Sequence, residues 1–117
     1  MKILLSLLLA TASPAIADGP EIVGAEARPD GSGWTVSVTL IHPDTGWDHY
    51  ADGWEVRGPN GALLGERPLA HPHVSEQPFN RSLSRIAIPE DVNEVSIRAR
   101  CNHGDWAKDE FLLKLTR

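Results

Sequence analysis

The sequence predicts an all-β domain, a seven-stranded antiparallel sandwich of the immunoglobulin or fibronectin type, behind an N-terminal signal peptide. Glycine or proline interrupts the chain every few residues after the first 17, and the short runs between them are rich in valine, isoleucine, leucine and tryptophan. Seven such runs follow one another, and Trp54 stands early in the third. That number of strands and an early tryptophan are typical of these sandwiches. A Greek-key barrel is the alternative architecture.

Residues 1–17 have the features of a secretory signal peptide. Lys2 gives a basic start, an apolar stretch of about ten residues follows, and Ala15 and Ala17 supply the small side chains that a signal peptidase reads. The stretch is shorter than the roughly 20 apolar residues that a membrane-spanning helix needs. We therefore expect cleavage after Ala17, no transmembrane segment, a periplasmic or secreted location, and one sandwich domain over residues 18–117. An N-terminal core helix is the alternative.

The predicted first three strands lie in the first half of the chain. Residues 21–27 form the first, and the turn at 29–33 contains glycines that can adopt positive φ. Residues 34–41 form the second and clearest strand, because apolar and polar side chains alternate along it and so face opposite sides. The third strand is predicted at 54–57, where Trp54 and Val56 share one face.

Four further strands are predicted after a tight hairpin turn at 59–61. Residues 62–65 form a short fourth strand and residues 81–88 the fifth. The sixth, at 94–101, again alternates apolar with polar side chains, and the last covers 109–115.

Composition and charge exclude some classes of partner. The chain has 16 acidic and 11 basic residues and no basic cluster, so binding to nucleic acid or to an anionic membrane lacks its main electrostatic contribution. Cys101 is the only cysteine, so the domain cannot form an internal disulfide and must be stabilised by packing.

The connections between the predicted strands differ in composition. In an antiparallel sandwich, the loops at 42–53, 66–79 and 102–108 share one end, and the turns at 29–33, 59–61 and 89–93 share the other. Long loops in small domains are uncommon unless they have a function, and sites are often built from loops on a rigid scaffold. The long loops contain all five histidines of the chain: His42, His49, His71, His73 and His103. We therefore predict that this end carries the function.

The five histidines are the predicted metal ligands, for zinc or copper(II). Imidazole and carboxylate groups are the ligands that these ions and nickel share. In His71-Pro72-His73, the proline favours an extended residue before it, and extended residues two apart point the same way. His42 and Cys101 continue the inward-facing positions of their strands and could face each other across the core. The alternative is that the histidines only hold the loops in shape and that Cys101 is a core residue.

Aromatic side chains in the same loops predict a second kind of site. Trp47, Tyr50 and Trp106 could stack on a glycan or anchor a periplasmic protein, with Asp48 and Glu76 as polar contacts. In the alternative, the rings pack over the end of the core and Asp48 caps a turn.

Catalysis has the least support among the functions considered. The chain contains no nucleophile elbow, phosphate-binding loop or zinc-protease helix motif. His73 near Glu76 and His49 near Asp48 could act as general-base pairs in a small hydrolase. The residues favour a binding module over an enzyme and leave the oligomeric state open.

Two segments carry a resemblance to other proteins. The sequences GWDHYADGW (46–54) and HPHVSEQPFNRSL (71–83) are similar to motifs in a group of small exported bacterial proteins without assigned function. The resemblance covers most of the predicted domain and implies a periplasmic protein in a bacterium with an outer membrane. It implies no activity and no site residue.

Overall fold

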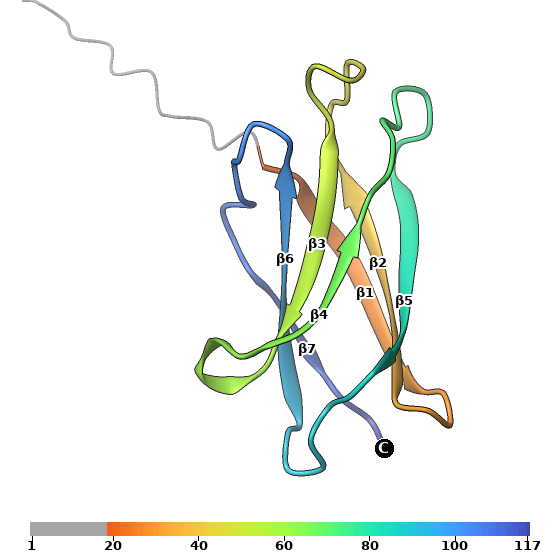
Figure 1. Cartoon of the computed structure of the whole chain (residues 1–117), viewed down its shortest axis with the longest axis vertical. Coiled ribbons are helices and arrows are strands. Elements are labelled where there is room, and N and C mark those ends of the chain that lie inside the picture. The colour runs from red at the N-terminus through yellow and green to blue at the C-terminus, as the bar shows by residue number, and fades with distance from the viewer. Residues whose placement is uncertain (1–18) are drawn as a thin grey trace, which may run out of the picture.

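The computed structural model describes residues 19–117, and these form seven β-strands (Figure 1). The predicted signal peptide, residues 1–17, lies outside the described residues. No helix within residues 19–117 has the length and apolar character required to cross a membrane. The strands are β1 (Glu21–Pro29), β2 (Trp34–Ile41), β3 (Ala51–Arg57), β4 (Leu63–Pro68), β5 (Phe79–Ile86), β6 (Glu94–Cys101) and β7 (Phe111–Lys114).

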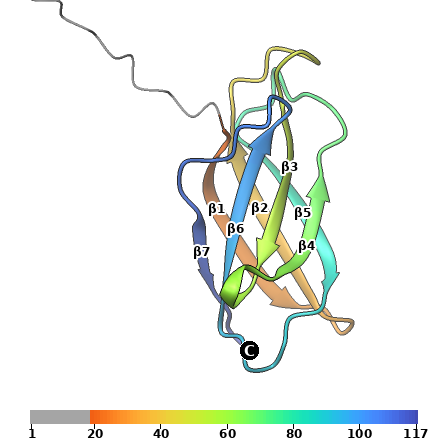
Figure 2. The ribbon, with the colours of Figure 1, turned by 60° about the vertical axis from the view of Figure 1, so that its left-hand side comes forward.

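The strands form two sheets that pack face to face (Figure 2). The first sheet has the order β1-β2-β5, and the second has the order β4-β3-β6-β7. All neighbouring strands are antiparallel. The prediction of an all-β domain with seven antiparallel strands in two sheets is therefore confirmed.

The core lies between the sheets and follows from the alternation in the sequence. Val36, Val38 and Leu40 of β2 are fully buried, and they face the equally buried Ile97 of β6 across the sandwich. Trp54 of β3 is 1% exposed, which confirms it as a core residue. Each large apolar side chain buried in this way contributes about 1.5–3 kcal/mol relative to exposure to water.

The bounds of five strands differ from the prediction: β1 extends to Pro29, β7 is shorter at Phe111–Lys114, and β3, β4 and β5 differ as follows. β3 begins at Ala51, three residues early, because Ala51 and Gly53 pair with Cys101 and Arg100 of β6. β4 continues to Pro68, where ladder pairing with β3 overrides the low strand propensity of the charged residues Glu66 and Arg67. β5 is shifted by two residues to Phe79–Ile86, because its first residues pair with the end of β2.

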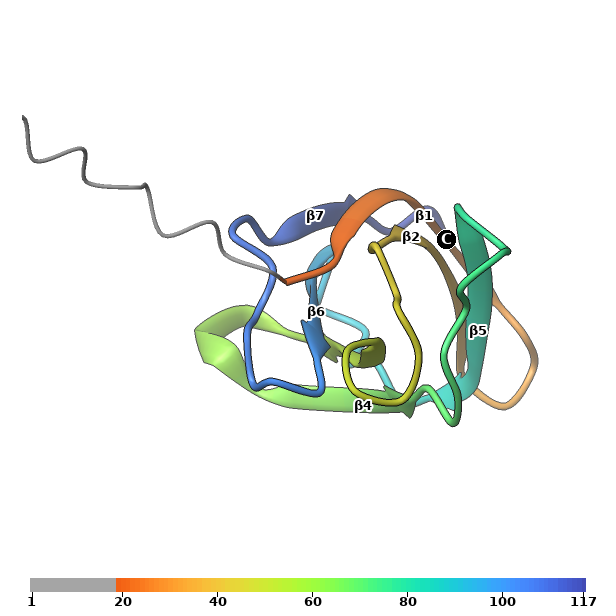
Figure 3. The same cartoon turned by 90° about the horizontal axis from the view of Figure 1, so that it is seen from above.

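The connections separate into two ends, as predicted (Figures 1 and 3). We call the end formed by loops 42–50, 69–78 and 102–110 the histidine end. The opposite end, formed by segments 30–33, 58–62 and 87–93, is called the turn end. The predicted hairpin turn at Pro59–Gly61 is a short 3-10 turn, in which Asn60 has a φ of 62°.

Candidate metal site at the histidine end

Three potential metal ligands come together at the histidine end. One ligand atom from each of His42, His49 and Cys101 lies within 4.8 Å of the other two. His42 directly follows β2, His49 belongs to loop 42–50, and Cys101 is the last residue of β6. His42 and Cys101 are each 1% exposed, and His49 is partly exposed. Loop 42–50 thus contributes two ligands and the end of β6 contributes the third to what we call the HHC group.

A buried carboxylate orients the first of these ligands. His42 Nδ1 lies 2.5 Å from Asp44 Oδ1, and both side chains are almost completely buried. Every partner of the Asp44 carboxylate is a nitrogen that can donate, so the carboxylate accepts and the His42 proton is on Nδ1. The lone pair of a neutral His42 ring is then on Nε2. A carboxylate behind the ring is the usual arrangement for a metal-binding histidine, because it fixes the tautomer and raises the basicity of the ligand nitrogen.

Asp44 also joins two loops of the histidine end. Its Oδ1 accepts a hydrogen bond from the Ala51 N–H at 2.9 Å, and its Oδ2 accepts one from the His73 N–H at 2.7 Å. Gln77 strengthens the same junction, since its side-chain oxygen accepts from the His42 N–H at 3.0 Å and its amide nitrogen donates to the His73 carbonyl at 2.8 Å. The position of His42 is thus fixed by its own loop and by loop 69–78.

His49 contacts a histidine on each side. Its ring meets His42 edge to face at 4.7 Å and stacks on His103 at 4.1 Å, with 10° between the latter two planes. Its Nε2 is buried and has no hydrogen-bond partner among the described residues. His103 Nε2 donates to the Asp48 carbonyl at 2.6 Å. Lone pairs lie in the ring plane, so the parallel rings of His49 and His103 cannot both point at one ion, and His103 stays outside the HHC group.

The two histidines of the His-Pro-His segment form a separate cluster. Their rings are 4.5 Å apart, and His71 Nδ1 donates to the Pro72 carbonyl at 3.0 Å. His73 stacks on Phe79 at 4.0 Å, and its Nε2 accepts a hydrogen bond from Arg81 at 2.8 Å. Burial, and then the neighbouring Arg81 and His71, hold the pKa of His73 below its ordinary value of 6.5. The contact with Arg81 thus occupies the Nε2 atom of His73 in this arrangement.

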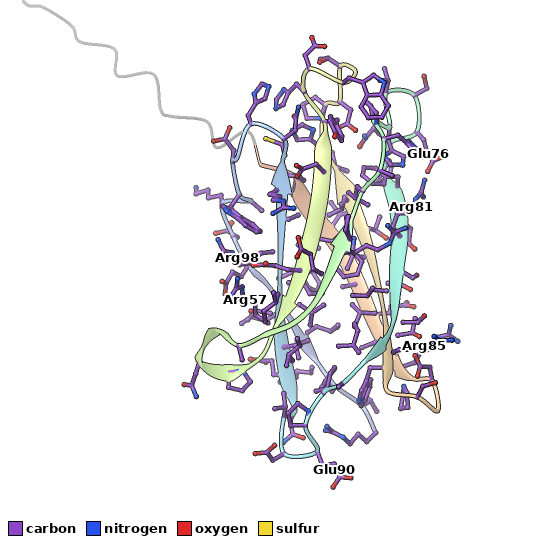
Figure 4. The ribbon with its side chains drawn as sticks, in the orientation of Figure 1. Arg57, Glu76, Arg81, Arg85, Glu90 and Arg98 are labelled. Atoms are coloured by element: carbon purple, nitrogen blue, oxygen red, sulfur yellow. The ribbon has the colours of Figure 1, made fainter. Side chains whose placement is uncertain are left out.

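The predicted polar and aromatic contacts are at the surface of the same end. Trp47 is 66% exposed and meets Tyr50 edge to face at 5.6 Å. The Asp48 carbonyl accepts from the Asn102 side chain, which ties loop 42–50 to loop 102–110. Glu76 pairs with Arg81 at 3.3 Å near the start of β5 (Figure 4).

Trp106 lies apart from the other two aromatic rings. Its ring is covered by Arg98 at 4.2 Å and by Arg100 at 5.7 Å, and its backbone forms a β-bridge with Arg100. Arg98 also lies near Glu55, and Arg100 pairs with Asp52 at 3.1 Å. Trp106 therefore holds loop 102–110 against the second sheet through cation–π contacts.

Sequence reasoning missed the roles of Asp44 and Arg81. His42-Pro43-Asp44 has the same spacing as His71-Pro72-His73, and extended residues two apart point the same way. The argument from extended geometry that was applied to His71-Pro72-His73 would therefore have paired His42 with Asp44. Arg81 gives no such signal, because its contact with His73 depends on the path of loop 69–78.

Comparisons with known proteins give one relative of limited coverage. The chain is 48% identical over 62 residues to a protein of Halomicrobium mukohataei named "Putative lipoprotein". The aligned segment is 53% of this chain and 30% of the relative, so the chain spans less than a third of that protein's length. The relative's name fits an uncharacterised exported group. No family model matches the chain, and no solved structure matches it.

Proposed function

We propose that the protein is an exported binding domain that holds one transition-metal ion, zinc or copper, through His42, His49 and Cys101. The observation that carries the proposal is the approach of their three ligand atoms to within 4.8 Å of one another. Two imidazoles and a thiolate suit zinc and copper, because both ions accept nitrogen and sulfur ligands. The buried His49 Nε2 without a partner and the carboxylate behind His42 support the same site.

The geometry needs only a small adjustment to bind an ion. Metal–ligand bonds of about 2.0–2.3 Å place the ligand atoms of a tetrahedral site about 3.3–3.7 Å apart. The longest separation in the HHC group would therefore have to contract by up to about 1 Å. Three protein ligands match the number found in zinc sites that keep a fourth position for water or an external ligand.

The architecture and the export features support a binding role. The strand orders β1-β2-β5 and β4-β3-β6-β7 support a fibronectin-type sandwich, a scaffold that presents loops at its ends. Residues 1–17 read as a signal peptide, and the relative is named as a lipoprotein, which supports a periplasmic or secreted location.

The test is a metal titration of the untagged domain, residues 18–117. We expect one zinc ion to bind, and we expect cobalt(II) or copper(II) in its place to give a thiolate charge-transfer absorption. Cys101→Ser should abolish that absorption, and His49→Gln should weaken binding at least 10-fold. His71→Gln is the matched control, because it removes an imidazole of the same end that lies outside the HHC group. Equal binding by all four proteins, or no binding by the wild type, would overturn the proposal.

A second candidate is recognition of a protein or a glycan by Trp47. The observation that favours it is the 66% exposure of this large ring beside Tyr50 at the histidine end. Aromatic anchors of this kind carry much of the energy in many interfaces. Binding to a glycan or periplasmic-protein array that is lost in Trp47→Ala and kept in Cys101→Ser would establish this function independently of the metal.

A further inference from the structure

The buried charges around the HHC group add up to a defined total when a metal is bound. The ligand form of Cys101 is the thiolate, with one negative charge, and the two ligand imidazoles are neutral. Asp44 adds a second negative charge, and its side chain is 0% exposed. A divalent ion would therefore give a neutral buried site, whereas a monovalent ion would leave one uncompensated negative charge.

The groups hydrogen-bonded to Asp44 do not offset its charge. The Asp44 carboxylate accepts hydrogen bonds from the His42 ring nitrogen and from two backbone N–H groups. None of these donors carries a formal charge when His42 is a neutral ligand. Arg81 of β5 contacts the His73 ring, whose backbone N–H bonds Asp44, but Arg81 also pairs with Glu76. An uncompensated charge in a buried site carries a large desolvation penalty.

We propose that Asp44 is a specificity-determining residue that makes the HHC group favour divalent zinc over monovalent copper. The inference rests on the proposed function, because it assigns a charge preference to the same site. Asp44 acts through the His42 ring and does not touch the ion. Across one ring in a buried site, its attraction to a second positive charge is strong enough to change the ratio of the two affinities about 10- to 100-fold.

Asp44→Asn separates charge from orientation. An amide oxygen at the Oδ1 position would still accept from His42 Nδ1 and from the Ala51 N–H, so the His42 tautomer is preserved. The amide nitrogen would face the His73 N–H, and one hydrogen bond to loop 69–78 is lost. Gln77→Ala is the matched control, because it weakens the same loop junction without changing any charge.

The experiment measures the dissociation constants of zinc(II) and copper(I) on residues 18–117 by competition with chelators, with copper kept reduced under anaerobic conditions. We expect Asp44→Asn to lower the ratio of zinc affinity to copper(I) affinity about 10- to 100-fold. Gln77→Ala and Asp44→Glu should change both affinities by similar factors and leave the ratio near the wild-type value. Should Asp44→Asn fail to fold, Asp44→Ser removes the same charge with a smaller side chain.

The outcomes separate this inference from the proposed function. An equal loss of both affinities in the charge-removing variant would show that Asp44 has only a structural role, and the metal site would stand. An unchanged ratio with unchanged affinities would also overturn the inference alone. Failure of the wild-type protein to bind either ion would overturn both.

Discussion

Asp30 at the turn end and Asp44 at the histidine end each accept three hydrogen bonds, but from different kinds of donor. Asp30 accepts from the Ser32 N–H, the Thr35 hydroxyl and the Arg85 N–H, at 2.9, 2.8 and 3.0 Å. Asp44 also accepts three hydrogen bonds, but one of its donors is the His42 imidazole. Asp30 joins its turn to β5, whereas Asp44 fixes a loop and a potential metal ligand together. The two carboxylates therefore differ in whether an ionisable ring is among their donors.

The largest expected effect comes from removing the Asp44 carboxylate. Asp44→Ala leaves three buried donors without an acceptor, and we expect the free energy of unfolding to fall by about 3–5 kcal/mol. Urea denaturation followed by tryptophan fluorescence measures the loss. Asp30→Ala is the control at the turn end, since its carboxylate is near the surface and its donors can bond to water. An equal loss of stability in the two variants would remove the distinction between the ends.

Metal addition should stabilise the protein through the histidine end alone. At a free zinc concentration of 100 times the dissociation constant, we expect a gain of about 2.7 kcal/mol in the free energy of unfolding. The gain should vanish in His49→Gln and with a chelator, and it should persist in Asp30→Ala. Thermal melting with and without zinc measures it, and a gain that survives in His49→Gln would place the ion elsewhere.

Mild acid should weaken the histidine end before the turn end. Burial and Arg81 hold the pKa of His73 below 6.5 in the folded protein, so the unfolded chain takes up a proton first as the pH falls below that value. The stability due to neutral His73 is complete above pH 6.5 and is lost as the pH falls from there toward the folded pKa. We expect this slope to decrease in His73→Gln, measured by urea denaturation in metal-free buffer between pH 7 and about pH 5. An unchanged slope would assign the effect to other histidines.

The contribution of Asp30 to stability should be lost at a lower pH than that of His73. Hydrogen bonds from Arg85, Thr35 and Ser32 hold the pKa of its carboxyl below 3.8, so its contribution is complete above that value and is lost as the pH falls through the folded pKa. Carboxyl chemical shifts from NMR titration would locate the transition. A midpoint at or above 3.8 would contradict the hydrogen bonding described here.

The smallest expected effect is that of Trp47→Ala. Because the ring is 66% exposed, its removal should change the free energy of unfolding by no more than about 0.5 kcal/mol. Zinc affinity should also stay at the wild-type value. A large loss of stability would mean that the ring packs over the end of the core.

The sequence pattern was enough to predict the number of strands and the shared end of the long loops, although not the bounds of every strand, because both depend on local pattern and on antiparallel topology. It could not select the HHC group from five histidines. His73 is directed toward Arg81, which is eight residues away, and His49 lies against His103, which belongs to another loop. Such contacts depend on the path of each loop. Loop sequences have no periodic pattern from which that path could be predicted.

The positions of His42 and Cys101 have a mechanical consequence. His42 follows the second strand, in one sheet, and Cys101 ends the sixth strand, in the other sheet. In immunoglobulin domains a disulfide joins the second and sixth strands of the sandwich, and this chain has one cysteine only. An ion held by both residues would serve as a reversible cross-link between the ends of the same two strands, so stretching a loaded molecule from its termini should leave the segment between them closed until the ion is released.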